Sequence, residues 1–197
     1  MTTDTMDRRR REFLLSATTT VGGIATVAAA LPFVASMLPS ERARATGAPV
    51  EVDVGKVEGG TLVTVEWRGK PVWLLHRTEE MLAALGKHDA KLRDPQSRQP
   101  QQPAYCRNAT RSIKPDYFVA VGICTHLGCV PHFLGKAGDP RLGADWPGGF
   151  FCPCHGSTFD LAGRVYGGAP APINLEIPPH GYLSDRRLLI GADREGT

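Results

Sequence analysis

The sequence has few cysteines, little net charge and no internal repeat. Five cysteines in 197 residues are too few for a disulfide scaffold of this size. The formal net charge of +3 lacks the basic excess of a nucleic-acid-binding protein, so we expect no nucleic-acid partner. No long amphipathic helical pattern occurs, whereas 22 Gly and 16 Pro favour a loop-rich, mainly β protein.

Charged side chains are absent from residues 14–38, a stretch rich in Ala, Gly and Thr. As a helix it would be about 37 Å long, which is enough to cross a bilayer core of about 30 Å. Arg10 and Arg11 precede it in a pattern typical of a twin-arginine export signal. We therefore expect residues 1–13 to be a cytoplasmic tail and residues 14–38 a transmembrane anchor. The alternative is a cleaved signal peptide, whose apolar core is shorter, at about 7–15 residues.

The residues after the anchor divide into a tether and one domain. Residues 39–49 are small and polar and predict a flexible tether. Within residues 50–197, alternating or continuous apolar runs predict an antiparallel β sandwich or barrel. A hairpin is expected over 61–76, a short helix capped by Thr78 and ending near Leu85, and a polar surface loop over 91–102. Further strands are expected at 118–123, 149–151, 174–177, 182–183 and 188–190.

Two short boxes combine cysteine with histidine: residues 124–129 read CTHLGC and residues 152–157 read CPCHGS. One Cys and one His from each box make a Cys2His2 ligand set, and one cysteine per box is left over. Gly128 and Gly156 allow tight turns whose backbone amides can point at a bound group. A [2Fe-2S] cluster with two Cys on one iron and two His on the other is the Rieske arrangement.

Zinc is the main alternative for a Cys2His2 set. Structural zinc sites usually pair Cys with Cys and His with His, at spacings of two to five residues. Here each box pairs Cys with His and carries an extra Cys, so the pattern favours the iron–sulfur cluster. Thiol redox chemistry by Cys152 and Cys154 is a weaker alternative.

The chain resembles the Rieske iron–sulfur subunits of bacterial ubiquinol–cytochrome c reductases, the cytochrome bc1 complexes. The resemblance covers the anchor, the tether, residues 101–103 (QQP), both boxes and the loop 168–176 (GAPAPINLE). It implies a Rieske-type β domain with a cluster-binding subdomain at about 122–172, on the periplasmic side of the bacterial inner membrane. The cofactor is then one [2Fe-2S] cluster.

The resemblance also gives roles to single residues. It implies that Cys129 and Cys154 form a disulfide, which fits an exported protein. Ser157 would donate a hydrogen bond to the cluster, and Leu127, Pro170 and Pro172 would shield it. The implied cluster ligands are Cys124, His126, Cys152 and His155.

Two features depart from the resemblance. Many respiratory relatives carry a tyrosine where this chain has Phe159, so a hydrogen bond to a ligand sulfur is missing and a lower midpoint potential is expected. Residues 131–149 form a longer inter-box segment, which we interpret as a surface loop, either a neutral insertion or a partner contact. Neither His132 in that segment nor His76 or His88 is expected to be a ligand, and Cys106 has no assigned role.

The implied activity belongs to a complex. His155 would hydrogen-bond ubiquinol and take a proton as the cluster takes an electron, and the domain would then reduce cytochrome c1. The expected partners are cytochrome b, cytochrome c1 and ubiquinol in a dimeric, proton-translocating complex, in which this subunit does not turn over alone. Alternatives are the Rieske subunit of a molybdenum oxidoreductase such as arsenite oxidase, a soluble Rieske ferredoxin, and the corresponding cytochrome b6f subunit.

Overall fold

The computed structural model describes residues 3–40 and 47–192. The chain divides into two compact units, Met1–Ala45 and Thr46–Thr197. Each unit is described by itself. The predicted tether falls largely on residues 41–46, which lie outside the described residues, so it stays a prediction.

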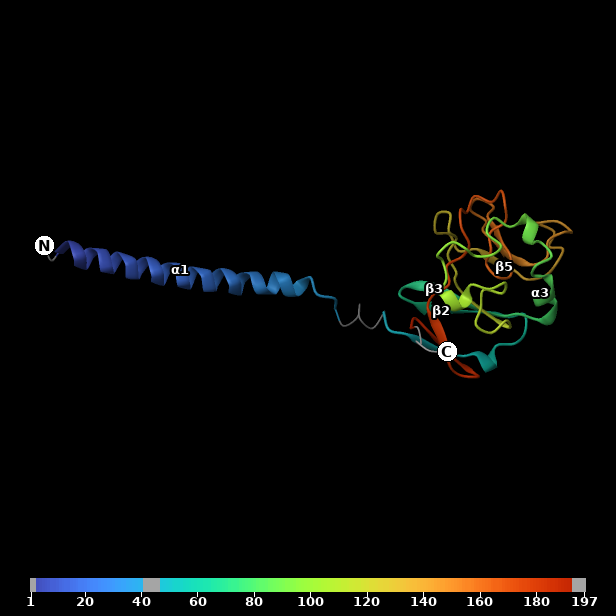
Figure 1. Cartoon of the computed structure of the whole chain (residues 1–197), viewed down its shortest axis with the longest axis horizontal. Helices are drawn as coiled ribbons and strands as arrows, with labels where there is room; N and C mark the ends of the chain where they lie inside the picture. Colours follow the sequence, from blue (N-terminus) through green and yellow to red (C-terminus); the bar gives the residue numbers. More distant parts are fainter. Residues whose placement is uncertain (1–2, 41–46, 193–197) are drawn as a thin grey trace. The chain divides into compact units, whose positions relative to one another are not determined.

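The first unit is one helix, α1 (Thr3–Ser36), seen as a continuous rod in Figure 1. Within the described part of the chain, its residues Asp7–Ser36 form the helix that is long and apolar enough to cross a membrane. Hydroxyls of Thr19 and Thr26 donate to the carbonyls four residues earlier, at 2.8 Å each, which satisfies them within the helix. The helix begins well before residue 14 and includes the arginine run, because that run contains no helix-breaking residue.

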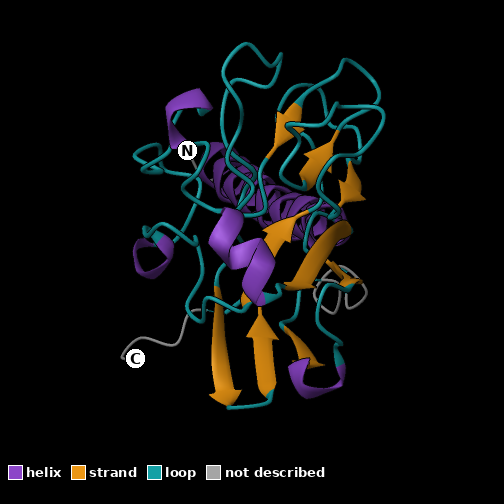
Figure 2. Cartoon of the chain, turned by 90° about the vertical axis from the view of Figure 1, so that its right-hand side faces the viewer, coloured by secondary structure: helices purple, strands orange, loops and turns teal. Residues whose placement is uncertain are grey.

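Residues 47–192 of the second unit form three antiparallel sheets of three strands, joined by long loops (Figure 2). Their orders are β1-β9-β8, β2-β3-β4 and β5-β6-β7. Short helices lie in the connections: η1 (Val54–Lys56), α3 (Glu79–Ala84), η2 (Asp89–Lys91) and η3 (Ala104–Cys106). The strands are β1 (Val50–Asp53), β2 (Leu62–Trp67), β3 (Lys70–His76), β4 (Tyr117–Val121), β5 (His132–Leu134), β6 (Gly149–Phe151), β7 (Thr158–Phe159), β8 (His180–Ser184) and β9 (Arg187–Ile190).

Strands β3 and β4 are buried on both faces, which explains the continuous apolar run in β3. Successive side chains of a strand point to opposite faces. Trp73 and Leu75 accordingly enter one apolar core, and Val72 and Leu74 enter another. The first core contains residues of the cysteine boxes, and the second is closed by β1, β8 and β9. The central sheet therefore supports the box loops on one side only.

Several predicted elements are confirmed. The hairpin pairs β2 with β3 across a turn at Arg68 and Gly69. In α3 the Thr78 side chain accepts from the backbone amide of Met81, as the predicted cap requires. Strands β4, β6, β8 and β9 also lie where apolar runs predicted them.

One expectation is wrong, and two are incomplete. Residues 174–177 form no strand, because their backbone bonds go to three separate segments: Leu175 N to Gly163 O, Ile177 N to Gln101 O, and Val121 N to Glu176 O. Residues 131–149 are not only a surface loop, since they contain β5 and the buried Trp146, whose indole donates to the Leu134 carbonyl at 3.0 Å. The polar loop 91–102 is also partly buried, at Leu92 and Ser97.

Candidate metal centre

The first box is a closed loop between β4 and β5. The Cys124 amide donates to the Cys129 carbonyl at 2.7 Å, and the Gly128 amide donates to the Cys124 carbonyl at 3.0 Å. Gly128 has φ +86°, which side-chain-bearing residues rarely adopt. The glycine in this box is thus required by the turn.

The second box, between β6 and β7, is closed by the same pair of backbone hydrogen bonds. The Cys152 amide donates to the Ser157 carbonyl at 2.8 Å, and the Gly156 amide donates to the Cys152 carbonyl at 2.9 Å. Gly156 has φ +78°. In both loops, therefore, the first cysteine is fixed by the residue five positions later and by the glycine four positions later. Cys124 and Cys152 occupy equivalent places, which sets them apart from the other two box cysteines.

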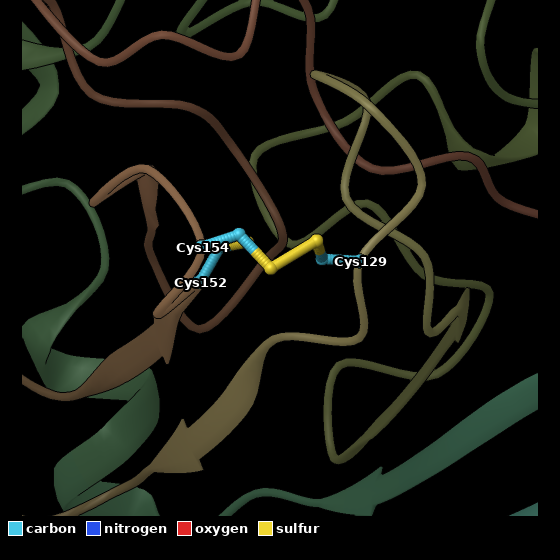
Figure 3. A group of neighbouring side chains, drawn as sticks. All are labelled: Cys129, Cys152 and Cys154. Carbon is cyan, nitrogen blue, oxygen red and sulfur yellow. A yellow bond between two sulfur atoms is a disulfide. The ribbon is translucent and has the colours of Figure 1, made fainter.

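Those other two, Cys129 and Cys154, are joined by a disulfide with a Cα–Cα distance of 6.7 Å. Figure 3 shows this bond with the Cys152 side chain beside it. The three sulfur atoms lie within 4.8 Å of one another. Two of them are consumed by the disulfide, so this group is no ligand set by itself. Its effect is to hold the two box loops together.

The other two cysteines and the two histidines of the boxes are arranged with their sulfur atoms inside the domain and their imidazole rings nearer to solvent. Cys124 and Cys152 are each 2% exposed, whereas His126 is half-buried and His155 is exposed. The two imidazole rings meet edge to face with centroids 4.7 Å apart. Two thiols and two imidazoles from different loops are thus brought together, with the imidazoles on the solvent side.

The surroundings of Cys152 act on its thiol in opposite directions. Burial is the largest influence and raises its pKa, and the hydrogen bond with the Cys124 thiol acts the same way. Hydrogen bonds from the backbone amides of Cys154 and His155 lower the pKa, because they stabilise the thiolate. Buried sulfurs with amide donors fit a bound metal group, which supplies the positive charge that thiolates need.

Two side chains tie the boxes to the proline loop at 168–173. The Ser157 hydroxyl oxygen accepts from the Ala171 amide at 3.0 Å, which leaves its proton available for donation. The Thr125 hydroxyl donates to the Ile173 carbonyl at 2.6 Å. The role of Thr125 was missed from the sequence, although its place between Cys124 and His126 was a signal.

The predicted shielding residues are solvent-facing. Leu127 is 70% exposed, and Pro170 and Pro172 are also exposed. Phe159 is fully buried in the core that contains Cys124 and Cys152. Cys106 is not brought to the boxes; its sulfur lies 4.0 Å from the His180 ring nitrogen. Arg10 and Arg11 lie in α1, in the other unit.

Comparisons with known proteins match most of the chain. Residues 1–40 match the family model described as "Ubiquitinol-cytochrome C reductase Fe-S subunit TAT signal". Residues 95–179 match the model of the "Rieske [2Fe-2S] domain". The second match spans both boxes and the proline loop.

Curated relatives cover nearly the full length. A protein of Allochromatium vinosum is 59% identical over 98% of this chain and 94% of its own length. Relatives from Rhodospirillum rubrum and Blastochloris viridis are 45% and 41% identical, over 92% and 96% of this chain and 91% and 96% of their own lengths. All three are named ubiquinol–cytochrome c reductase iron–sulfur subunit.

Proposed function

The chain belongs to the family of Rieske iron–sulfur subunits of ubiquinol–cytochrome c reductase, and on that premise we propose how its own residues serve the reaction. It is a subunit of the bc1 complex, carries a Rieske [2Fe-2S] domain and transfers electrons from ubiquinol. We assign the cluster to Cys124, His126, Cys152 and His155. The observation that carries this assignment is the pair of equivalently closed loops, which bring two buried thiols beneath two outward imidazoles.

When bound, the cluster accepts and releases one electron, at a potential raised by its two histidine ligands. The protein's part is to hold it and to limit its exposure. Cys124 and Cys152 hold it from the apolar core, and the disulfide between Cys129 and Cys154 keeps the loops in register. Ser157 has a free hydroxyl proton for a cluster sulfide, because its oxygen already accepts from Ala171.

His155 is the residue proposed to meet the quinol. Its ring is exposed, whereas His126 is half-buried. An exposed imidazole can hydrogen-bond a quinol hydroxyl and hold the proton that the quinol loses. Leu127, Pro170 and Pro172 are exposed as well, and would exclude water from the cluster once a partner subunit covers them.

The proposed partners are cytochrome b and cytochrome c1 in a dimeric complex that contributes to proton translocation. The proposed location is the bacterial inner membrane, with α1 as a single-pass anchor and residues 50–197 in the periplasm. The length and apolar composition of α1 and the match of residues 1–40 to the export-signal model support this location. The names of the relatives favour this complex over a molybdenum oxidoreductase, a soluble ferredoxin or a zinc protein.

Ligand substitutions in the full-length protein test the assignment. Cys124→Ser, Cys152→Ser, His126→Ala and His155→Ala should each abolish the EPR spectrum of the reduced cluster in isolated membranes. Cys106→Ser and His132→Ala are matched controls and should retain it. A retained spectrum in any of the four variants, or its loss in the His132 control, would contradict the ligand set. Purification from the same membranes should also recover b- and c-type haems with this subunit.

A further inference from the structure

Three arginine side chains lie inside the second unit, although arginine is rarely fully buried unless it is paired. Arg77, Arg111 and Arg164 are 2%, 0% and 1% exposed. Arg164 is paired with the carboxylates of Asp160 at 2.8 Å and Asp89 at 3.0 Å. Within residues 47–192, no carboxylate forms an ion pair with Arg77 or Arg111. Burial lowers the pKa of both arginines and Asp160, at longer range, partly raises it again, but among these residues no negative charge is in direct contact with either guanidinium.

Among the described residues, Arg111 donates only to neutral acceptors. Its guanidinium donates to the carbonyls of Ala162 at 3.0 Å, Gly163 at 3.3 Å and Leu175 at 2.8 Å, and to the Gln102 side-chain oxygen at 2.9 Å. Its backbone has φ +48°, a conformation that costs a non-glycine residue about 1–3 kcal/mol. The fold keeps an arginine in this position in spite of that cost.

Arg77 donates to a carbonyl next to those that Arg111 binds. It donates to the carbonyls of Thr110 at 2.9 Å and Leu161 at 3.3 Å, and also to the Pro115 carbonyl. Together with Arg111 it therefore occupies three consecutive carbonyls, those of residues 161–163. This stretch begins two residues after Phe159, at the end of the strand that leaves the second box.

The segment 161–163, whose carbonyls accept from the two arginines, contributes to the apolar core that contains the box cysteines. Leu161 and Leu175 pack in the same apolar cluster as Cys124 and Cys152. In such surroundings charges interact more strongly than in water, because few mobile dipoles screen them. Burial lowers the pKa of both arginines to about 10, so they remain charged at neutral pH. Reduction adds one negative charge to the cluster, and a buried positive charge nearby favours that state.

We propose that Arg77 and Arg111 raise the midpoint potential of the cluster through their buried charge, which no direct ion pair offsets. The inference rests on the proposed cluster site and deepens it. The two arginines are not catalytic residues, because they touch neither a ligand side chain nor the substrate; they act through their electric field. The effect is opposite in sign to that expected from Phe159.

The test is a redox titration of the cluster EPR signal in membranes that hold the full complex. Arg111→Gln removes the charge and should shift the midpoint potential downward. Arg93→Gln is the matched control: Arg93 also donates to a loop carbonyl, that of Ala169 at 3.1 Å, but it is exposed and its charge is screened by water. Equal potentials in wild type and Arg111→Gln, or equal shifts in the two variants, would overturn the proposal.

A second variant keeps the test decisive if Arg111→Gln does not assemble. Arg111→Lys keeps a donor at the site, and lysine loses its charge within an accessible pH range, whereas arginine does not. The potential of this variant, measured relative to wild type, should fall as pH is raised from 5 to 9. A difference that does not change with pH would count against a role of charge. Absence of the cluster EPR signal from the wild-type protein would instead contradict the cluster assignment. Failure of this proposal can therefore be distinguished from failure of the proposed function.

Discussion

Replacing both Cys129 and Cys154 by serine should destabilise the domain, because the unfolded chain would no longer be restricted by the disulfide. The disulfide joins cysteines 25 residues apart. A bridge closing a loop of that size lowers the entropy of the unfolded chain by an amount worth about 3.5 kcal/mol at 25 °C. For a domain the size of residues 46–197, this contribution corresponds to a fall of about 10 °C in the unfolding midpoint.

The assay is stepwise heating of membranes that contain the wild-type or the double-serine complex, followed by measurement of the remaining cluster EPR signal. A strong thiol reductant should lower the wild-type midpoint to that of the variant and leave the variant unchanged. Neither serine would be buried, since Cys129 is half-buried and Cys154 exposed. A fall of less than about 3 °C would refute the entropic reasoning.

Three further outcomes are expected. Thr78→Ala removes the hydroxyl that caps the Met81 amide and should lower the free energy of unfolding by about 1 kcal/mol, measured by thermal unfolding. Thr78→Ser should change it little. Asp160→Ala removes the buried carboxylate partner of Arg164 and should cost about 3–5 kcal/mol; a cost below 1 kcal/mol would mean that the pair is not needed. Phe159→Tyr supplies a donor in the core of the metal centre and should raise the midpoint potential, and a redox titration showing no rise would disprove this.

The sequence predicted the elements whose chemistry is local. Each box combines cysteine with histidine at close spacing, so a Cys2His2 ligand set could be proposed from the boxes, whereas the choice of Cys124 and Cys152 among the cysteines rested on the resemblance. The β3 run and the Thr78 cap are also local signals, of burial and of helix initiation. Each of these depends on residues that are neighbours in the chain.

What the sequence did not predict depends on contacts between distant segments. Strand β1 has only four residues and is defined by pairing with β9, at the other end of the domain. Strand β5 is hidden in a segment rich in Gly and Pro. Arg77 and Arg111 were not singled out, because nothing in the chain reveals that carbonyls of residues 161–163 will surround them.

The pairing of the first and last strands has a mechanical consequence. Force transmitted along the chain from residue 47 reaches β1 first, and β1 is hydrogen-bonded to β9 from Val50↔Ile190 to Asp53↔Arg187. Their sheet closes the core on one face of β2-β3-β4, whereas the box loops adjoin the core on the other face. A pull on the domain is therefore borne by strands that share no core with the cysteine boxes. When the domain moves, the metal centre therefore moves with it, and the force does not strain the positions of its ligands.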